Sequence, residues 1–141
     1  MHSKLIVLVG GCFDFLHYGH IMFLTQAKTY GDHLVVLLES DEKVKMLKGE
    51  GRPFHTQEQR KTMLESLRVV DEVVMLPMMH SNEEYYSLIQ KIAPTVIAFT
   101  EGDPKLEHKM KQTEMIGARA IVIPSIHTPS TTKLAKLLSL E

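Results

Sequence analysis

Short runs of apolar residues alternate along the chain with longer stretches in which apolar and polar positions mix. An uninterrupted apolar run bounded by turn residues is typical of a strand buried on both faces of a sheet. The pair Gly10-Gly11 predicts a turn that ends the first of these runs. The runs predict strands over residues 5–9, 33–38, 72–76, 95–99 and 120–123.

The stretches between these runs predict helices, because their apolar residues recur three or four positions apart. Thr56 with Gln59 three residues later forms a capping-box pattern, and Pro104 and Gly117 bracket a further helix. The predicted helices cover residues 18–30, 41–47, 56–70, 82–91, 104–116 and 130–138.

Strands that alternate with helices in this way predict a parallel sheet with right-handed crossovers. We therefore expect an α/β fold, a single doubly wound (Rossmann-like) domain over residues 1–141 with a five-stranded parallel sheet. Sheets of this kind bind ligands beyond the carboxyl ends of their strands. The expected binding loops are residues 10–20, 40–55, 100–104 and 124–132.

Composition and charge narrow the classes of function. The chain has 141 residues with 16 Lys and Arg against 17 Asp and Glu, so it lacks the basic excess of proteins that bind nucleic acids or membrane surfaces. Its single cysteine, Cys12, allows no internal disulfide and favours a reducing compartment, the cytoplasm. The apolar run nearest the start is too short for a signal-peptide core or a membrane span. We expect neither a nucleic acid nor a membrane as partner.

His17 and His20 are the first candidates for chemistry. They lie three residues apart where a helix is predicted to begin, which puts both imidazoles on one face. Gly19 between them allows a ligand to approach the backbone, and the start of a helix offers N–H groups to an anion. We interpret the pair as a phosphate site, with a surface pair or an incidental metal pair as alternatives. Neither a GxGxxG nor a GxxxxGK[ST] pattern occurs.

Four segments resemble motifs of the HxGH nucleotidyltransferase superfamily, in its cytidylyltransferase-like family. GCFDFLHYGH at residues 11–20 resembles the HxGH signature, and LKGEGRP at 47–53 resembles a loop of bacterial heptose-phosphate adenylyltransferase domains. EQRKTMLESLRVVDEVV at 58–74 is similar to a helix and strand shared by those enzymes and glycerol-3-phosphate cytidylyltransferases. PSTTKL at 129–134 resembles the closing STT motif, so the resemblance runs over nearly the whole chain.

The resemblance implies an enzyme that transfers a nucleoside monophosphate from a nucleoside triphosphate, with ATP favoured, to a small phosphorylated acceptor such as a sugar 1-phosphate. A phosphate oxygen of the acceptor would attack the α-phosphorus in line, and pyrophosphate would leave. The resemblance also implies Mg²⁺ carried in with the triphosphate and a homodimer. We expect no metal site built from protein groups alone, because the sequence has no dense carboxylate cluster.

The motifs assign roles to individual residues. The expected catalytic residues are His17, His20 and Lys48. The expected nucleotide-binding residues are Gly11, Cys12, Phe13, Asp14, Gly19, Ser130, Thr131 and Thr132. The expected acceptor-binding residues are Asp41, Arg52, Arg60 and Asp103. Structural roles stay open for three of these sites: a turn at Asp14, a small buried filler at Cys12 and a helix N-cap at residues 130–132.

Two departures from the family patterns bear on the acceptor. The segment SIHTPSTT lacks the arginine that precedes STT in glycerol-3-phosphate cytidylyltransferases, which favours the heptose enzymes. Thr100 and Glu101 stand where the heptose enzymes carry a lysine and a glycine. The alternatives are therefore a glycerol-3-phosphate cytidylyltransferase, an FMN adenylyltransferase, or a non-catalytic nucleotide-binding module.

Overall fold

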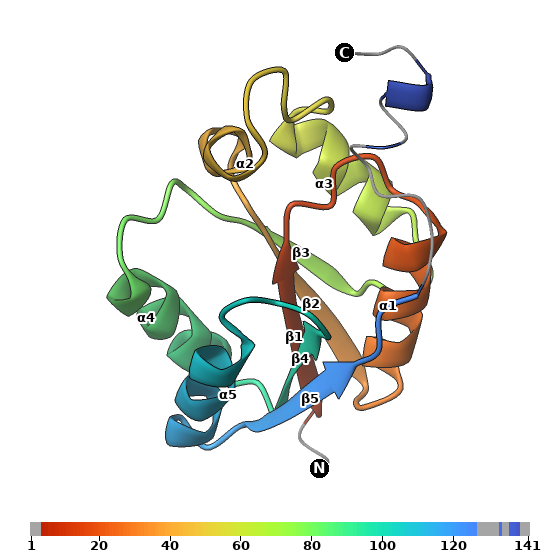
Figure 1. The fold of residues 1–141 in the computed structure, drawn as a ribbon. Coiled ribbons are helices and arrows are strands. Elements are labelled where there is room, and N and C mark those ends of the chain that lie inside the picture. The colour runs from red at the N-terminus through yellow and green to blue at the C-terminus, as the bar shows by residue number, and fades with distance from the viewer. Residues whose placement is uncertain (1–3, 127–132, 134–135, 139–141) are drawn as a thin grey trace.

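Five parallel strands form one sheet in the order β3-β2-β1-β4-β5 (Figure 1). This computed structural model describes residues 4–126, 133 and 136–138. The sheet confirms the predicted doubly wound α/β class with five parallel strands. The strands are β1 (Ile6–Gly11), β2 (His33–Leu38), β3 (Glu72–Met75), β4 (Val96–Thr100) and β5 (Arg119–Ile123).

Helices cover both faces of the sheet. The helices are α1 (Tyr18–Lys28), α2 (Asp41–Lys48), α3 (Gln57–Glu65), α4 (Asn82–Ile92) and α5 (Leu106–Met115). Helices α1 and α3 lie on one face and α4 and α5 on the other, while α2 lies beyond the carboxyl end of β2 (Figure 1). Successive residues of β1 alternate between the faces, with Val7 and Val9 in the α1/α3 core and Leu8 in the α4 core. Because both faces are covered, the strands are uninterrupted apolar runs.

Strand β1 continues two residues beyond the predicted end. Gly10 and Gly11 pair with Leu37 and Leu38 of β2, so the predicted turn at the two glycines is wrong. A Cβ on Gly11 would lie 2.9 Å from the ring of Phe13, which is closer than real contacts allow. Gly11 is therefore needed for the close approach of Phe13 to the strand rather than for a turn.

The predicted helix over residues 56–70 is longer than the observed one. The capping box at Thr56 is present, because its Oγ1 accepts from the Gln59 N–H and Gln59 Oε1 accepts from the Thr56 N–H. Helix α3 nevertheless ends at Glu65 rather than at Val70. Val70 is buried in the α1/α3 core, so apolar residues that suggested a longer helix belong to the turn that follows it.

The C-terminal elements were predicted with mixed success. Helix α5 begins at Leu106, two residues after the Pro104 start that the sequence predicted. The predicted helix over residues 130–138 lies largely outside the described residues. Within the described part of the chain, no helix is both long and apolar enough to span a membrane.

Candidate active site

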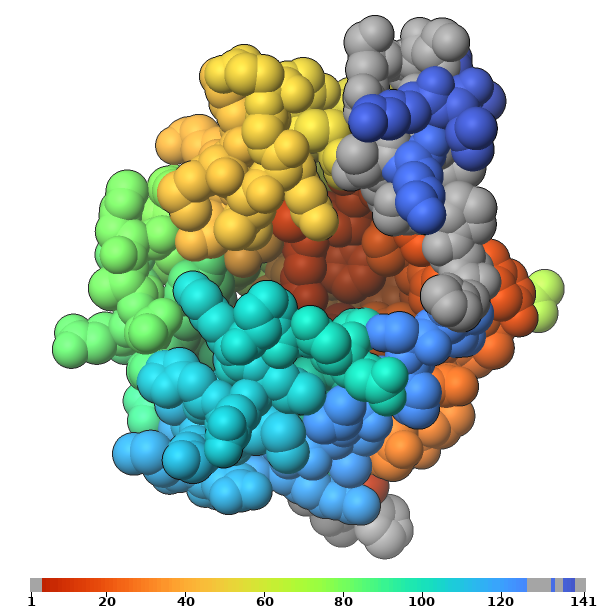
Figure 2. All heavy atoms as spheres, viewed as in Figure 1, coloured from red at the N-terminus to blue at the C-terminus, as the bar shows by residue number. Residues whose placement is uncertain are grey.

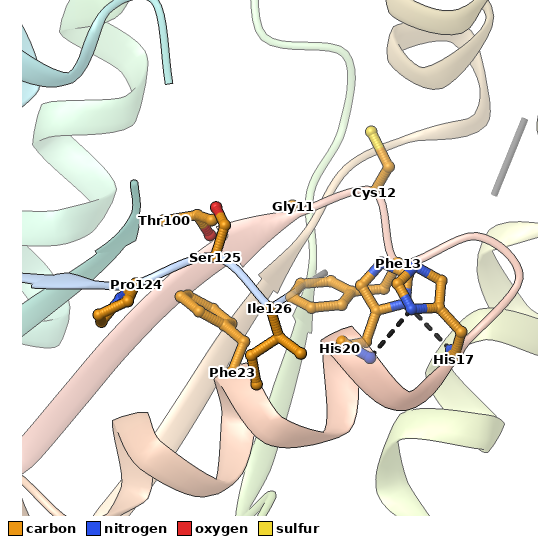
Figure 3. Close-up of a pocket in the computed structure, with 12 residues that line it drawn as sticks. Gly11, Cys12, Phe13, His17, His20, Phe23, Thr100, Pro124, Ser125 and Ile126 are labelled. Atoms are coloured by element: carbon orange, nitrogen blue, oxygen red, sulfur yellow. Dashed lines mark hydrogen bonds between the residues drawn. The ribbon is translucent and has the colours of Figure 1, made fainter. Parts of the chain in front are cut away.

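A cavity of about 310 Å³ opens at the carboxyl ends of β1, β4 and β5, beside the start of α1. In Figure 2 the hollow has the red first loop as its floor and is bordered by the gold segment around residue 50 and the teal segment around residue 100. The strand order leaves a crevice here, because β1 pairs with β2 on one side and with β4 on the other. The cavity is lined by Gly10, Gly11, Cys12, Phe13, His17, Gly19, His20, Phe23, Thr100, Pro124, Ser125 and Ile126 (Figure 3).

The backbone at the start of α1 orients both imidazoles. His17 is the N-cap residue, and its Nδ1 accepts a hydrogen bond from the Gly19 N–H at 3.1 Å. The Nδ1 of His20 accepts from the His17 N–H at 3.3 Å. A neutral imidazole that accepts at Nδ1 carries its proton on Nε2. Each ring is therefore a hydrogen-bond donor at Nε2, and the ring centroids lie 4.0 Å apart (Figure 3).

Both imidazoles are neutral at pH 7. Burial lowers the pKa of His20 to about 4, and the neighbouring His17 and Lys48 add to this effect. Burial also lowers the pKa of His17. The ring of Phe13, 5.5 Å from that of His20, supplies apolar surroundings. Two neutral N–H donors beside the positive end of a helix dipole are suited to bind a phosphate group.

The loop between β1 and α1 has a strained backbone. Phe13 and Phe15 have φ angles of 48° and 55°, a region that residues other than glycine rarely adopt. Ring packing maintains this conformation: Phe13 lies against Gly11 and His20, and Phe15 stacks on Phe54 with centroids 4.5 Å apart. Strain of this kind clusters at functional sites, where the surrounding structure holds a particular geometry.

Asp14 joins this loop to the glycine-rich loop after α2. Its buried carboxylate accepts hydrogen bonds from the N–H groups of Phe54 and His55, at 2.7 and 3.0 Å, and from Arg52 Nε at 2.9 Å. Burial raises the pKa of this carboxyl, but the two N–H groups and the guanidinium outweigh it and the pKa is lowered. Asp14 is thus an ionised anchor for the LKGEGRP loop, and Arg52 is directed to that anchor.

Arg60 is fully buried below the site. Its guanidinium donates to the carbonyls of Cys12, Glu39 and His55 and to the Asp41 carboxylate, at 2.7 to 3.0 Å. Those four bonds use most of the five N–H donors that an arginine has. The structure therefore places Arg60, and through it Asp41, among the groups that hold the ends of β1 and β2 together.

Lys48 and Asp103 lie in different surroundings. Lys48 is the last residue of α2 and is exposed, and it is not among the residues that line the cavity. Its charge contributes to the lowered pKa of His20 and opposes the rise in the pKa of Cys12. Asp103 instead accepts from the Lys105 N–H and from Lys109 Nζ at the start of α5. None of the four predicted acceptor-binding residues, Asp41, Arg52, Arg60 and Asp103, is among the residues that line the cavity.

Other predicted residues are found in the cavity or lie outside the described part of the chain. Gly11, Cys12, Phe13 and Gly19 all line the cavity, as expected for the first loop. Ser130, Thr131 and Thr132 lie outside the described residues.

The sequence analysis missed one residue of the lining, Phe23, which lies one turn after His20 on α1. Ser125 lies in the expected loop after β5 but was not singled out, and its hydroxyl donates to the Glu101 carbonyl at 2.8 Å. The helical spacing of Phe23 from His20 is the signal that could have found it. Thr100, noted for its departure from the family pattern, lines the same cavity as the two histidines.

A parallel α/β sheet with a helix beginning at its switch point is the arrangement in which many proteins bind nucleotides. The chain belongs to the cytidylyltransferase-like family, whose sequence model matches residues 8–134. This confirms the family that the motifs predicted.

Curated relatives support the same assignment. The protein named Bifunctional protein HldE from Desulfatibacillum aliphaticivorans is 35% identical over 137 residues, which cover 94% of this chain and 26% of the relative. The protein of the same name from Aliarcobacter butzleri is 46% identical over 95 residues, 67% of this chain and 19% of the relative. The chain therefore spans about a fifth to a quarter of these relatives. The family assignment, rather than these longer relatives, supports the nucleotidyltransferase class that the motifs predicted.

Solved structures show the shared fold. The lipopolysaccharide core biosynthesis protein from Thermoplasma volcanium superposes with a TM-score of 0.71 and 20% identity, over 89% of this chain and 99% of that chain. The pantoate-beta-alanine ligase from Francisella tularensis gives a TM-score of 0.60 with 20% identity, over 89% of this chain and 61% of that chain.

Proposed function

We propose that this domain transfers adenylate from ATP to the phosphate of a small phosphorylated acceptor, a heptose phosphate or a similar sugar 1-phosphate, and releases pyrophosphate. The observation that carries this proposal is the histidine pair, whose Nε2–H donors line a cavity at the start of a helix. The motif resemblance to heptose-phosphate adenylyltransferase domains and the HldE relatives support the choice of nucleotide and acceptor.

The proposed reaction needs no covalent intermediate with the protein. A phosphate oxygen of the acceptor attacks the α-phosphorus of ATP, a new P–O bond forms, and the bond from the α-phosphorus to the β-phosphate bridge breaks. The Nε2–H groups of His17 and His20 donate to the oxygens on which negative charge builds up, and Lys48 holds the departing phosphates. This is catalysis by positioning and by preorganised charge stabilisation.

We further propose that Mg²⁺ enters bound to the triphosphate, where it neutralises phosphate charge. Among the described residues, no group of three or more His, Cys, Asp or Glu side chains could hold a metal ion, so the oxygens of the nucleotide and water would supply most of its ligands. A homodimer and a cytoplasmic location belong to the same proposal, the latter because the expected substrate is an intracellular nucleotide.

The test is pyrophosphate release with ATP or CTP against heptose 1-phosphate, glycerol 3-phosphate and FMN. We expect release with ATP and the sugar phosphate. Release only with CTP and glycerol 3-phosphate, or only with ATP and FMN, would replace the proposed substrates. Nucleotide binding with no release for any pair would identify a non-catalytic binding module.

A further inference from the structure

A carboxylate at the end of β2 takes no part in the reaction described above. Glu39 follows β2 directly, and its side chain lies on the α4 face of the sheet. The hydroxyl of Tyr85, on α4, lies 3.0 Å from each of its two carboxylate oxygens. Neither residue was singled out by the sequence analysis, because they are 46 positions apart and belong to no recognised motif.

Glu39 adjoins the cavity through the ends of two neighbouring strands. Its backbone N–H donates to the Gly11 carbonyl at 3.1 Å, and Arg60 Nη1 bonds both the Cys12 and the Glu39 carbonyls. Cys12 lines the cavity, and in Figure 3 its thiol points away from His17 and His20. Burial raises the pKa of the Cys12 thiol, and the Glu39 charge adds to this effect. The Glu39–Tyr85 pair is therefore not part of the cavity lining itself, but it lies next to Gly11 and Cys12, on the side toward α4.

The Glu39 carboxylate retains capacity to accept hydrogen bonds. A carboxylate offers about four acceptor positions, and among the described residues the Tyr85 hydroxyl is the donor that reaches it. The charges of Lys43 and Lys109 act on it through space, and Lys109 is itself bonded to Asp103. Burial raises the pKa of the Glu39 carboxyl, and these cations and Tyr85 offset only part of that.

The chemistry of this position selects among ligand groups. A carboxylate repels phosphate oxygens and other carboxylates, and it attracts groups that donate hydrogen bonds. A half-buried carboxylate also discriminates against ligands without a donor, because such ligands displace water from its remaining acceptor positions and put no donor in its place. If the phosphates of both substrates bind on the side of Lys48 and the histidines, the position beside Glu39 suits the hydroxyl-bearing part of an acceptor.

We propose that Glu39, held in place by Tyr85, is the specificity residue for the acceptor and accepts hydrogen bonds from hydroxyl groups on its carbon skeleton. The proposal rests on the transfer reaction described above. It restricts the acceptor to phosphorylated sugars and polyols, and it gives Tyr85 a positioning role.

The test measures binding by calorimetry in the presence of a non-hydrolysable ATP analogue. The probes are heptose 1-phosphate, glycerol 3-phosphate and propyl phosphate, of which the last carries a phosphate but no hydroxyl group. We expect wild-type protein to bind at least one hydroxylated probe about tenfold or more tightly than propyl phosphate, the scale of a charged hydrogen bond. In Glu39→Gln this ratio falls to about twofold or less, and in Tyr85→Phe it falls partway.

The matched control is Glu42→Gln, which removes an exposed carboxylate from the first turn of α2. It should preserve the ratio, and all variants should bind the ATP analogue with unchanged affinity and unfold at the wild-type urea concentration. A wild-type protein without the preference, or a Glu39→Gln variant that keeps it, would overturn the proposal. Tighter binding of a hydroxylated probe with no pyrophosphate release for any substrate pair would contradict the transfer reaction but would still support the role of Glu39.

Discussion

His17 performs two tasks with the two nitrogens of one ring. Its Nδ1 caps α1 by accepting from the Gly19 N–H, and its Nε2 carries the proton that we propose to donate to phosphate. Asparagine is a good N-cap residue but cannot place a donor where Nε2 lies. The two tasks can therefore be separated by choice of substitution.

We expect His17→Asn to keep wild-type stability and to lower turnover by about 10²–10³-fold, the scale for losing one preorganised donor. His17→Ala should lose as much turnover and also about 1 kcal/mol of unfolding free energy, because the cap is gone. Steady-state rates of pyrophosphate release and urea unfolding measure the two effects. Near wild-type turnover in His17→Asn at saturating substrates would show that Nε2 has no catalytic role.

The lowered pKa of His20 predicts how stability depends on pH. The unfolded chain binds a proton at His20 near pH 6.5, whereas the folded chain does so only near pH 4, so the unfolded state holds more protons between these values. Stability is therefore lost as the pH falls through this window. Relative to His20→Gln, which keeps a residue suited to the capping box, wild-type protein should lose about 2 kcal/mol more between pH 7 and pH 5.

Urea unfolding of both proteins at several pH values measures this difference. Parallel stability curves for the wild-type and His20→Gln proteins would mean that the folded His20 titrates like an ordinary exposed histidine.

At the scale of elements, one buried side chain fixes the ends of β1 and β2 against the start of α3. Arg60 reaches the carbonyls of Cys12 and Glu39 and the carboxylate of Asp41. We expect Arg60→Met to lower the unfolding free energy by about 3–5 kcal/mol, because three carbonyls and a carboxylate lose their donor. Arg68→Met, at an exposed arginine just after α3, should change it by less than about 0.5 kcal/mol.

Urea midpoints of the two variants give the comparison. Arg60→Met could instead leave stability unchanged and only raise the KM for the acceptor. That result would support direct contact between Arg60 and the acceptor, as the sequence predicted.

The same element shows what sequence patterns can and cannot predict. The capping box at Thr56 was predicted because its two partners are three residues apart. The hydrogen bonds of the Arg60 guanidinium were not predicted, because Arg60 bonds groups that are 19, 21 and 48 positions away in the chain. The strands were predicted from their apolar runs. Gly11 was wrongly predicted to lie in a turn, whereas in the structure a glycine is needed there because the Phe13 ring packs closely against the strand. His17, His20 and Lys48 were predicted from local motifs, and the structure places both histidines in the cavity lining.

At the scale of the whole molecule, the cavity draws its lining from β1, α1, β4 and the segment after β5. Since β1, β4 and β5 belong to one sheet, ATP bound there should stabilise the domain as a unit. ATP at 100 times its Kd should add about 2.7 kcal/mol and raise the Tm of a single transition by about 10 °C.

Differential scanning calorimetry with ATP and with AMP at equal concentration is the measurement. AMP should give a smaller shift, because it lacks the phosphates that Lys48 is proposed to hold. Equal Tm shifts for ATP and AMP would show that the β- and γ-phosphates do not contribute to binding.

The sheet lies between the residues proposed for the transfer step and those proposed for acceptor recognition. The imidazoles of His17 and His20 belong to helix α1 on one face, whereas the Glu39–Tyr85 pair belongs to the α4 face. Each face has its own hydrophobic core. On the proposals above, mutations that accumulate on the α4 side alter which metabolite is recognised while the cap and both imidazoles keep their positions. If those proposals hold, a lineage carrying this domain could adopt a new acceptor without evolving the transfer step again.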